Sequence, residues 1–306
     1  MRRSILLAAL WIGPATGATA ATLHAGPGQQ YALPSQAIAA ARDGDTVAIH
    51  PGQYFDCAVV RRNDLTIEGV GGAVVLTDKP CQGKALLVID GHNVTIRNLT
   101  LQRVRVPDHN GAGIRAEGGD LTVEDTRFVN NQNGLLAASN QAATIRVTGS
   151  TFIGNGVCAG SCAHGIYVNQ IKLLDVERSR FLGTREGHHI KSRALSTRIV
   201  GCDIEDGPDG TASYLIDIPN GGNAVIAGNR LEKGPRSQNP ATVIMVGAEG
   251  VSQPTERLVF RDNTLVNDEG RPTTFVHNVT ATPAELQGNT FRGGVVRPFE
   301  GDGSSG

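Results

Sequence analysis

Apolar and polar residues follow a short pattern that recurs eight times along the chain. Each copy begins and ends on an apolar residue, with four mostly polar or small residues between them. The final apolar positions lie 23 to 34 residues apart. A repeat of this length indicates a stack of similar units, none of which can bury its apolar side alone. The copies span 96–101, 123–128, 147–152, 176–181, 199–204, 226–231, 260–265 and 286–291.

The position two residues before the end of each copy carries a small and mostly hydrogen-bonding side chain. At a sharp corner, such side chains can bond the backbone of the next turn of a stack. Cys202 belongs to this column, which favours a buried structural role for it over a reactive thiol. The column consists of Leu99, Thr126, Ser150, Ser179, Cys202, Asn229, Asn263 and Asn289.

A third strand-like segment separates successive copies of the pattern. Three short strands per unit predict an all-β parallel solenoid of about eight to ten coils, in which neighbouring coils bury each other's apolar sides. The absence of regularly spaced hairpin turns argues against a β-sandwich. The third segments span 113–117, 134–138, 165–169, 189–193, 215–219, 243–247 and 275–279.

The two ends of the chain differ from the repeats. Residues 33–42 are predicted to form a short amphipathic helix that caps the first coil, because open coil ends pair with other chains. Residues 1–20 have a basic start, a short apolar core and a small-residue cleavage site, which is typical of a secretory signal. The prediction is therefore one solenoid domain over residues 21–300, followed by a flexible tail at 301–306.

Composition and charge narrow the function. The chain has 39 glycines and only 4% aromatic residues, which favours short strands and tight turns. A net charge of −1 with scattered signs argues against a nucleic-acid or membrane surface. No segment reaches the ~20 apolar residues that a membrane span needs. We therefore expect a secreted or periplasmic protein that is monomeric.

Export permits disulfide bonds, and four of the five cysteines lie in two plausible pairs. Cys158 and Cys162 are close together in one glycine-rich loop, and Cys57 could pair with Cys81. The sequence leaves both pairings open.

The stretch Gly187 to Arg193 concentrates charged and ionisable residues on one third strand. If Ile190 and Ser192 point into the core, the strand period places His189, Lys191 and Arg193 on the outer face. Reading the middle outward position along the stack predicts a column in which Tyr167, Lys191 and Asp217 are immediate neighbours, about 4.8 Å apart. The full column is Arg115, Leu136, Tyr167, Lys191, Asp217, Met245 and His277, with Glu117, Asn169 and Arg193 beside it.

This cluster suits β-elimination on a uronate-containing polysaccharide. Removing the proton next to a uronate carboxyl needs a neutralised carboxylate, a base and a proton donor. Lys191 is the candidate base if neighbouring positive charges favour its neutral form. Arg193 is suited to a two-pronged contact with the substrate carboxylate. Tyr167 or His189 is the candidate proton donor, and Asp217 would either orient Lys191 or hold it charged.

The repeat resembles the right-handed parallel β-helix superfamily typified by pectate lyases. The resemblance covers residues 43 to 294 and rests on the pattern of strands and corners. It implies that the strand following the variable loops lines the substrate groove. Here that strand carries Lys191.

A narrower resemblance connects Lys191-Ser192 and the segment from Asn220 to Asn223 with alginate and chondroitin lyases of this fold. In those enzymes a Lys-Ser pair precedes an Arg-His-Gly-Asn segment, and the lysine is the base. The resemblance carries the role of base to Lys191. The arginine and histidine are missing here, because the segment reads Ile-Pro-Asn-Gly-Gly from position 218. The calcium ligands expected of that family are not identifiable, so calcium stays open.

Other interpretations compete with a catalytic one. His164 and His188 are candidates for substrate binding, but either could simply cap backbone groups. Lys191 and Asp217 could form only a surface ion pair. The remaining substrate-binding candidates are Arg115, Glu117, Asn169, Tyr214 and Asn220.

Three classes of function follow from these alternatives. The first is an exported lyase that acts on an acidic polysaccharide. The second is a glycoside hydrolase or uronate epimerase of the same fold, with a carboxylate in the leading role. The acidic loop of Asp203, Glu205, Asp206 and Asp209 could serve a hydrolase or bind calcium, although such residues also form ordinary turns. The third is a carbohydrate-binding envelope protein without catalysis.

Overall fold

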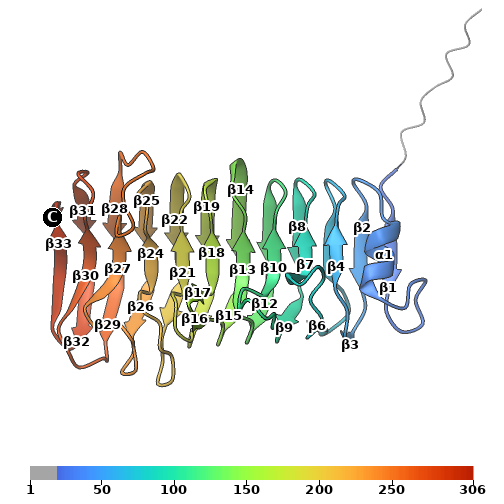
Figure 1. Cartoon of the computed structure of the whole chain (residues 1–306), viewed down its shortest axis with the longest axis horizontal. Coiled ribbons are helices and arrows are strands. Elements are labelled where there is room, and N and C mark those ends of the chain that lie inside the picture. The colour runs from blue at the N-terminus through green and yellow to red at the C-terminus, as the bar shows by residue number, and fades with distance from the viewer. Residues whose placement is uncertain (1–18, 306) are drawn as a thin grey trace, which may run out of the picture.

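The computed structural model describes residues 19–305. It is an elongated solenoid of about ten coils, in which three parallel sheets run the length of the molecule (Figure 1). The predicted all-β parallel solenoid is therefore confirmed. The predicted signal segment lies almost entirely outside the described residues. In residues 19–305, no helix has the length and apolar character needed to cross a membrane.

Each coil contributes one strand to each sheet, in the order sheet A, sheet B, sheet C. Sheet A consists of β1 (Thr22–Ala25), β2 (Thr46–Ile49), β5 (Thr66–Gly69), β8 (Val94–Arg97), β11 (Leu121–Glu124), β14 (Asn140–Thr148), β19 (Ile171–Glu177), β22 (Ser196–Val200), β25 (Asn223–Ala227), β28 (Leu258–Arg261), β31 (Ala284–Gln287) and β34 (Gly303–Ser305). Sheet B consists of β3 (Gly52–Tyr54), β6 (Val74–Thr77), β9 (Thr100–Gln102), β12 (Arg127–Val129), β15 (Thr151–Ile153), β20 (Arg180–Leu182), β23 (Asp203–Glu205), β26 (Arg230–Lys233), β29 (Thr264–Asn267) and β32 (Thr290–Gly293).

Sheet C faces the viewer in Figure 1 and carries the predicted third segments. It consists of β4 (Ala58–Val60), β7 (Ala85–Ile89), β10 (Ala112–Ala116), β13 (Asn133–Ala137), β18 (Ile166–Val168), β21 (Ile190–Ser192), β24 (Ile216–Ile218), β27 (Thr242–Val246), β30 (Thr273–Asn278) and β33 (Val296–Gly301). A small antiparallel hairpin, β16 (Val157–Ala159) and β17 (Ser161–Ala163), projects from the loop before β18.

The corner between sheets A and B explains the recurring pattern. The residue before each member of the predicted column has a positive φ, from Asn98 at 57° to Gly288 at 63°. This turn points the next side chain into the stack. There the backbone N–H of Asn229 donates to Oδ1 of Asn263 (3.1 Å), and Asn263 donates in the same way to Asn289 (3.1 Å). The predicted hydrogen-bonding column is confirmed, and Cys202 lies within it with 1% of its surface exposed.

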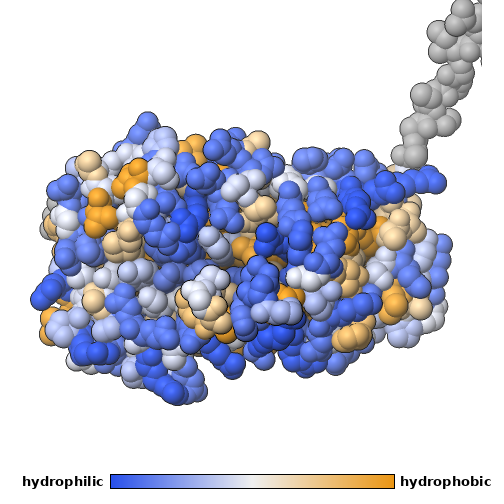
Figure 2. All heavy atoms as spheres, viewed as in Figure 1, coloured by the Kyte–Doolittle hydropathy of each residue, from blue (hydrophilic) through white to orange (hydrophobic). Residues whose placement is uncertain are grey.

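Apolar side chains from all three sheets fill the interior as one continuous core. Phe128, Phe152 and Phe181 stack on successive coils with ring centroids 4.5 and 4.6 Å apart. Strand side chains alternate between this core and the outer face, so the middle residue of each of the three-residue strands β18, β21 and β24 lies on the outer face of sheet C. Figure 2, in the same orientation, shows apolar surface toward the α1 end and mostly hydrophilic surface over the middle coils.

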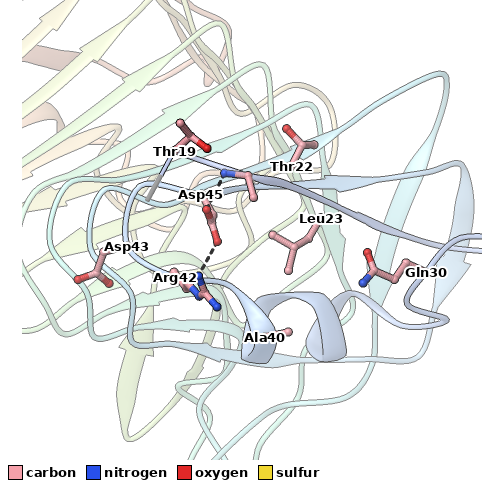
Figure 3. A pocket seen from close by; sticks show the side chains of 9 residues that line it. Thr19, Thr22, Leu23, Gln30, Ala40, Arg42, Asp43 and Asp45 are labelled. Carbon is pink, nitrogen blue, oxygen red and sulfur yellow. Dashed lines mark hydrogen bonds between the residues drawn. The ribbon is translucent and has the colours of Figure 1, made fainter. Parts of the chain in front are cut away.

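The helix α1 (Pro34–Ala40) lies at the N-terminal end of the stack, as predicted, and contributes Ala37 and Ile38 to the core (Figure 1). A cavity of 340 Å³ lies between this helix and β1 (Figure 3). Its carboxylate Asp45 accepts hydrogen bonds from the backbone N–H groups of Ala21 (2.7 Å) and Arg42 (2.8 Å). Asp45 therefore fastens the first coil to the cap.

Both pairings that the sequence left open are disulfides, between Cys57 and Cys81 and between Cys158 and Cys162. The first ties the loop before β4 to the next coil, and the second closes the β16–β17 hairpin. At the other end of the chain, residues 303–305 pair with β31, where the sequence analysis expected a flexible tail. The solenoid pattern therefore extends further than the glycine-rich sequence suggested.

Candidate active site on the outer face of sheet C

The central coils of sheet C bring the predicted polar residues into one column. Tyr167 of β18 pairs with Lys191 of β21, and Lys191 pairs with Asp217 of β24. Ile190 and Ser192 are fully buried. The predicted register is therefore confirmed, and Met245 follows Asp217 on β27.

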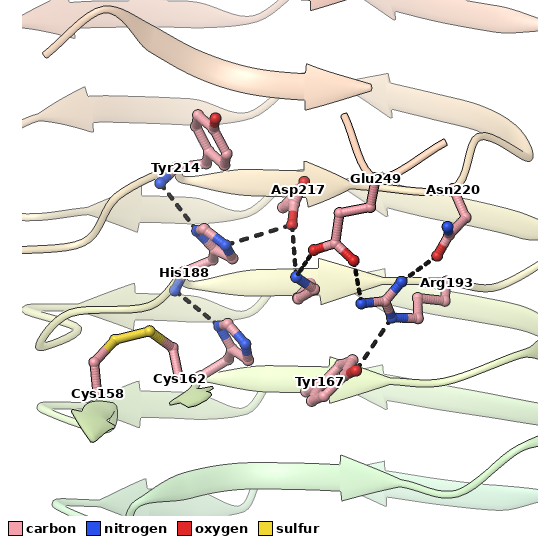
Figure 4. A network of polar contacts seen from close by, with 11 residues as sticks. Cys158, Cys162, Tyr167, His188, Arg193, Tyr214, Asp217, Asn220 and Glu249 are labelled. Carbon is pink, nitrogen blue, oxygen red and sulfur yellow. Dashed lines mark hydrogen bonds and ion pairs between the residues drawn. A yellow bond between two sulfur atoms is a disulfide. The ribbon is translucent and has the colours of Figure 1, made fainter. Parts of the chain in front are cut away.

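Lys191 lies between two carboxylates. Its Nζ is 3.2 Å from Oδ2 of Asp217 and 2.5 Å from Oε1 of Glu249. Asp217 belongs to the neighbouring strand, whereas Glu249 comes from the 247–257 loop that connects β27 to β28 (Figure 4). Two adjacent negative charges favour the charged ammonium.

Arg193 makes polar contacts on three sides of its guanidinium. Nη2 lies 2.5 Å from Oε2 of Glu249, and Nε donates to the hydroxyl oxygen of Tyr167 (3.1 Å). Nη1 donates to Oδ1 of Asn220, whose Nδ2 in turn donates to the backbone oxygen of Gly250 (3.1 Å). Figure 4 shows Arg193 between Tyr167, Glu249 and Asn220. Asn220, predicted to bind substrate, thus positions both Arg193 and the loop.

Asp217 is buried and only partly satisfied. Its Oδ2 contacts Lys191 and lies 3.4 Å from Nε2 of His188, while its Oδ1 has no hydrogen-bond partner within residues 19–305. Burial raises the pKa of Asp217 to about 6, against the attraction of Lys191. A buried carboxylate with a raised pKa can exchange a proton near neutral pH.

His164, His188 and Tyr214 form a stack of rings beside this column. The ring of His188 lies 4.8 Å from that of His164 and 5.0 Å from that of Tyr214. Nδ1 of His188 accepts the backbone N–H of Tyr214 (3.1 Å), and Nδ1 of His164 accepts the backbone N–H of His188 (3.0 Å). Each histidine thus caps the next coil, which was the structural alternative for both.

Burial is the main cause that keeps both capping histidines neutral. It lowers the pKa of His188 to about 3, with further contributions from Lys191 and Lys233. Burial also lowers the pKa of His164 well below its ordinary value, as does the neighbouring His188. With Nδ1 accepting, the ring proton of His188 is on Nε2, which faces Asp217.

The prediction for His189 was wrong. Its side chain is fully buried, with its ring nitrogens 2.8 Å from Oγ1 of Thr184 and 2.9 Å from Oδ1 of Asp206, and its ring packs edge-on against Phe181. The strand begins only at Ile190, so the period of two does not extend back to His189 at the corner. His189 cannot donate a proton to a substrate from this position.

Three other candidates lie away from Lys191 or act elsewhere. Arg115 and Glu117 belong to β10 and its following turn, three strands from β21, and form an ion-pair cluster with Lys84. Asn169 is on the neighbouring coil, but its side-chain amide donates to the backbone oxygen of Ala137 (2.8 Å). Arg115 and Glu117 are placed for a remote subsite only.

The acidic loop does not assemble as one cluster. Asp206 is bound to His189, and Asp209 pairs with Arg236. Glu205 pairs with Arg180 and Arg230 on sheet B. Within residues 19–305, no group of three or more histidine, cysteine, aspartate or glutamate side chains is arranged to hold a metal ion. Glu205, Asp206 and Asp209 therefore do not form a shared carboxylate site for calcium.

Glu249 is the residue that the sequence analysis missed. It lies in a Gly-Ala-Glu-Gly turn, outside the repeating strands, so neither spacing nor periodicity marks it. Only the path of the 247–257 loop across β21 brings its carboxylate to Lys191 and Arg193.

Comparisons with known proteins agree with this architecture. Residues 59–171 match the family model of a right-handed β-helix region. A search of curated proteins found no match. Among solved structures, an alginate lyase from Paenibacillus sp. str. FPU-7 is 17% identical, with 93% of this chain and 99% of that chain covered and a TM-score of 0.66.

Two further structures are similar over most of the chain. A pectate lyase is 13% identical, with 92% of this chain and 79% of that chain covered and a TM-score of 0.50. A pectin methylesterase from Aspergillus niger is 12% identical, with 91% and 87% covered and a TM-score of 0.50. At identities this low, the structural similarity shows only the fold. That fold is a right-handed parallel β-helix, as the sequence resemblance implied.

Proposed function

We propose that this right-handed parallel β-helix is a polysaccharide-active enzyme that cleaves an acidic, uronate-containing glycan by β-elimination. Two of the similar structures are named as lyases, of alginate and of pectate, which supports a polyuronate substrate. The observation that carries the proposal is the meeting of Lys191, Arg193 and Tyr167 on adjacent coils of the outer face. A base, a carboxylate-binding cation and a proton donor are thereby within reach of one sugar residue.

In this mechanism, Arg193 binds the substrate carboxylate and lowers the cost of placing negative charge on the adjacent carbon. Lys191, in its neutral form, takes the proton from that carbon. Asp217, 3.2 Å away and with its pKa raised by burial to about 6, accepts the ammonium proton that Lys191 must first release. This transfer is uphill, because a carboxylate is a weaker base than an amine and both Asp217 and Glu249 favour the ammonium form, so it adds to the barrier of the reaction. The electron pair of the broken C–H bond forms the C=C bond and expels the glycosidic oxygen.

Tyr167 is the candidate proton donor to the leaving oxygen. Its hydroxyl oxygen accepts a hydrogen bond from Nε of Arg193, so its own hydrogen stays available to another acceptor. The ring also lies close to both cations, 5.9 Å from Nζ of Lys191 and 5.8 Å from Cζ of Arg193. General acid catalysis of this kind contributes typically ~10²–10⁴-fold to a rate.

A glycoside hydrolase is the second candidate, favoured by the pairing of Asp217 with Glu249. Both carboxylates contact the same ammonium group, at 3.2 and 2.5 Å, so they are near neighbours. Retaining glycosidases hold two carboxyl groups about 5–5.5 Å apart. Burial raises the pKa of Asp217. Burial also acts to raise the pKa of Glu249, but the contacts with Lys191 and Arg193 outweigh it, so the pKa of Glu249 is lowered. A pair of carboxyl groups with one raised and one lowered pKa is what a general acid and a nucleophile need.

An exported protein in an oxidising compartment is the accompanying proposal for localisation. The disulfides Cys57–Cys81 and Cys158–Cys162 support it, because such bonds persist mainly outside the reducing cytosol.

The product distinguishes these reactions. The purified protein is incubated with a panel of alginate, polygalacturonate and glycosaminoglycan polymers, and both ultraviolet absorbance and new reducing ends are followed. A lyase produces the absorbance of an unsaturated uronate, and Lys191→Ala abolishes it. Lys172→Ala, which replaces an exposed lysine on sheet A, is the matched control and should retain full activity. Reducing ends without absorbance would establish the hydrolase instead. If neither signal appears, the protein binds polysaccharide without cleaving it.

A further inference from the structure

One carboxylate of the protein itself bridges the two cations of the site. Oε1 of Glu249 lies 2.5 Å from Nζ of Lys191, and Oε2 lies 2.5 Å from Nη2 of Arg193 (Figure 4). Both oxygens of a single carboxylate are thus used, one for each cation. Lys191 and Arg193 therefore stand at the spacing that one planar carboxylate group requires.

The backbone that carries Glu249 is fixed. The N–H groups of Gly247 and Glu249 donate to the backbone oxygens of Ile218 and Pro219, both at 2.9 Å. Beyond Glu249, the N–H of Gln253 donates to the oxygen of Asn220 (3.0 Å), and its side-chain amide donates to the oxygen of Arg193 (3.2 Å). Removing the carboxylate from the two cations therefore requires rotation of one side chain only.

The side chain of Glu249 has room to make that rotation once its two ion pairs break. It is 43% exposed, compared with 10% for Lys191 and 20% for Arg193. Rotamer changes of exposed side chains occur in picoseconds to nanoseconds, so no slow opening step precedes binding. Lys191 keeps its contact with Asp217, and Arg193 keeps its contacts with Tyr167 and Asn220, when the carboxylate of Glu249 rotates away.

We propose that Lys191 and Arg193 form a receptor for one carboxylate, which Glu249 fills in the unliganded protein and an unesterified uronate carboxylate fills on binding, before Lys191 passes its proton to Asp217 and Arg193 alone keeps the carboxylate. This inference rests on the proposed polyuronate substrate and narrows it to the free acid. Glu249 then competes with the substrate for the two cations, and only a negatively charged sugar residue replaces it without losing the ion pairs.

Replacement of the Glu249 carboxylate by the substrate favours a uronate with a free carboxylate over its methyl ester. A uronate carboxylate replaces both contacts of Glu249, so each cation keeps a negative partner. A methyl ester has no charge, and displacing Glu249 with it would leave the poorly exposed Lys191 and Arg193 without that compensation. Specificity thus comes from the ion pairs that the wrong substrate must break.

Equilibrium binding tests the inference independently of turnover. Hexamers of mannuronate, guluronate and galacturonate, each as free acid and as methyl ester, are titrated into the wild-type protein, Glu249→Gln and the control Glu256→Gln. Glu256 is exposed in the same 247–257 loop. We expect Glu249→Gln to bind the free acid about three- to tenfold more tightly, because a competitor worth a partly exposed ion pair is removed. Glu256→Gln should match the wild type.

The ester provides the second readout. The wild type should favour the free acid strongly, and Glu249→Gln should bind the ester measurably better than the wild type does. Equal or weaker binding of the free acid by Glu249→Gln, in a protein that binds hexamers, would overturn the inference while leaving the polyuronate substrate intact. An absence of hexamer binding by every variant would overturn both.

Discussion

Asp217 lies directly beside Lys191 on the next coil, with 3.2 Å between Oδ2 and Nζ. The pairing is asymmetric, because Oδ1 of the same carboxylate has no hydrogen-bond partner within residues 19–305. Burial disfavours the charged form and raises the pKa of Asp217 to about 6, although Lys191 acts in the opposite direction. The site therefore holds a carboxylate that the fold tolerates at some cost in stability, which is common at functional positions.

The first prediction concerns Asp217→Asn and the pH dependence of stability. The folded protein binds this proton more tightly (pKa about 6) than the unfolded chain, whose ordinary value is 3.8. The stabilising contribution of the group is therefore full below pH 3.8 and is lost as the pH rises through 6. We expect Asp217→Asn to gain up to about 3 kcal/mol relative to the wild type between pH 4 and pH 7.

Urea unfolding at a series of pH values measures this gain, and activity is measured on the same samples. The variant should lose at least about tenfold in turnover, because Lys191 loses its proton acceptor. A pH dependence of unfolding identical to the wild type would refute the assigned role of burial at Asp217.

The fold could be predicted from sequence because each coil repeats the same constraints. Residues with positive φ precede the corner column, from Asn98 to Gly288, and polar side chains of that column accept the backbone N–H of the preceding coil. The strand period then fixes which side chains of sheet C face outward. Tyr167, Lys191 and Asp217 were placed correctly on this basis alone.

The remainder of the site depends on geometry that no period describes. His189 lies just before β21, where the corner turns its side chain into the core toward Asp206. Glu249 reaches Lys191 across a loop whose path is set by hydrogen bonds to Pro219 and Asn220. Loop paths of this kind depend on tertiary contacts, so a pattern in the sequence cannot reveal them.

The second prediction tests the corner column. Asn263→Ala removes the Oδ1 that accepts from the backbone and side chain of Asn229, and the Nδ2 that donates to the oxygen of Ile226 (2.9 Å). Unpaired buried groups cost about 1–3 kcal/mol each, so we expect a loss of about 2–4 kcal/mol in the free energy of unfolding. Asn289→Ala, at the half-buried last rung, is the control and should lose less. Equal losses at both rungs would contradict the column as a buried ladder.

The third prediction separates structural from reactive cysteines. Burial raises the pKa of Cys202 to about 11, and its surface is 1% exposed. We expect no labelling by a thiol reagent in the native protein at pH 8 and one equivalent after denaturation without reductant. Reduction before denaturation should raise the number of labelled thiols per chain to five, since the other four cysteines are paired in disulfides. Rapid native labelling would show that Cys202 is accessible.

The fourth prediction concerns acid stability and the stacked ring of His188. Its neighbours are His164 and Tyr214 in the stack, Asp217 at Nε2, and the cations Lys191 and Lys233. Burial lowers the pKa of His188 to about 3, so the folded protein binds this proton more weakly than the unfolded chain does. The contribution of His188 is full above pH 6.5 and is lost as the pH falls toward 3.

His188→Asn removes the titrating ring but keeps an oxygen that can accept the N–H of Tyr214. We expect the Asp217→Asn parent to lose about 2 kcal/mol more in the free energy of unfolding than the Asp217→Asn, His188→Asn double variant between pH 7 and pH 5. Asp217 titrates in the opposite direction over part of this range, so the comparison is made in the Asp217→Asn background. His277→Asn, at a half-buried position on the same face, is the control and should follow the parent protein. If His188→Asn unfolds with the same pH dependence as its parent, the ring is not held neutral by burial, and its role as an uncharged cap between coils is wrong.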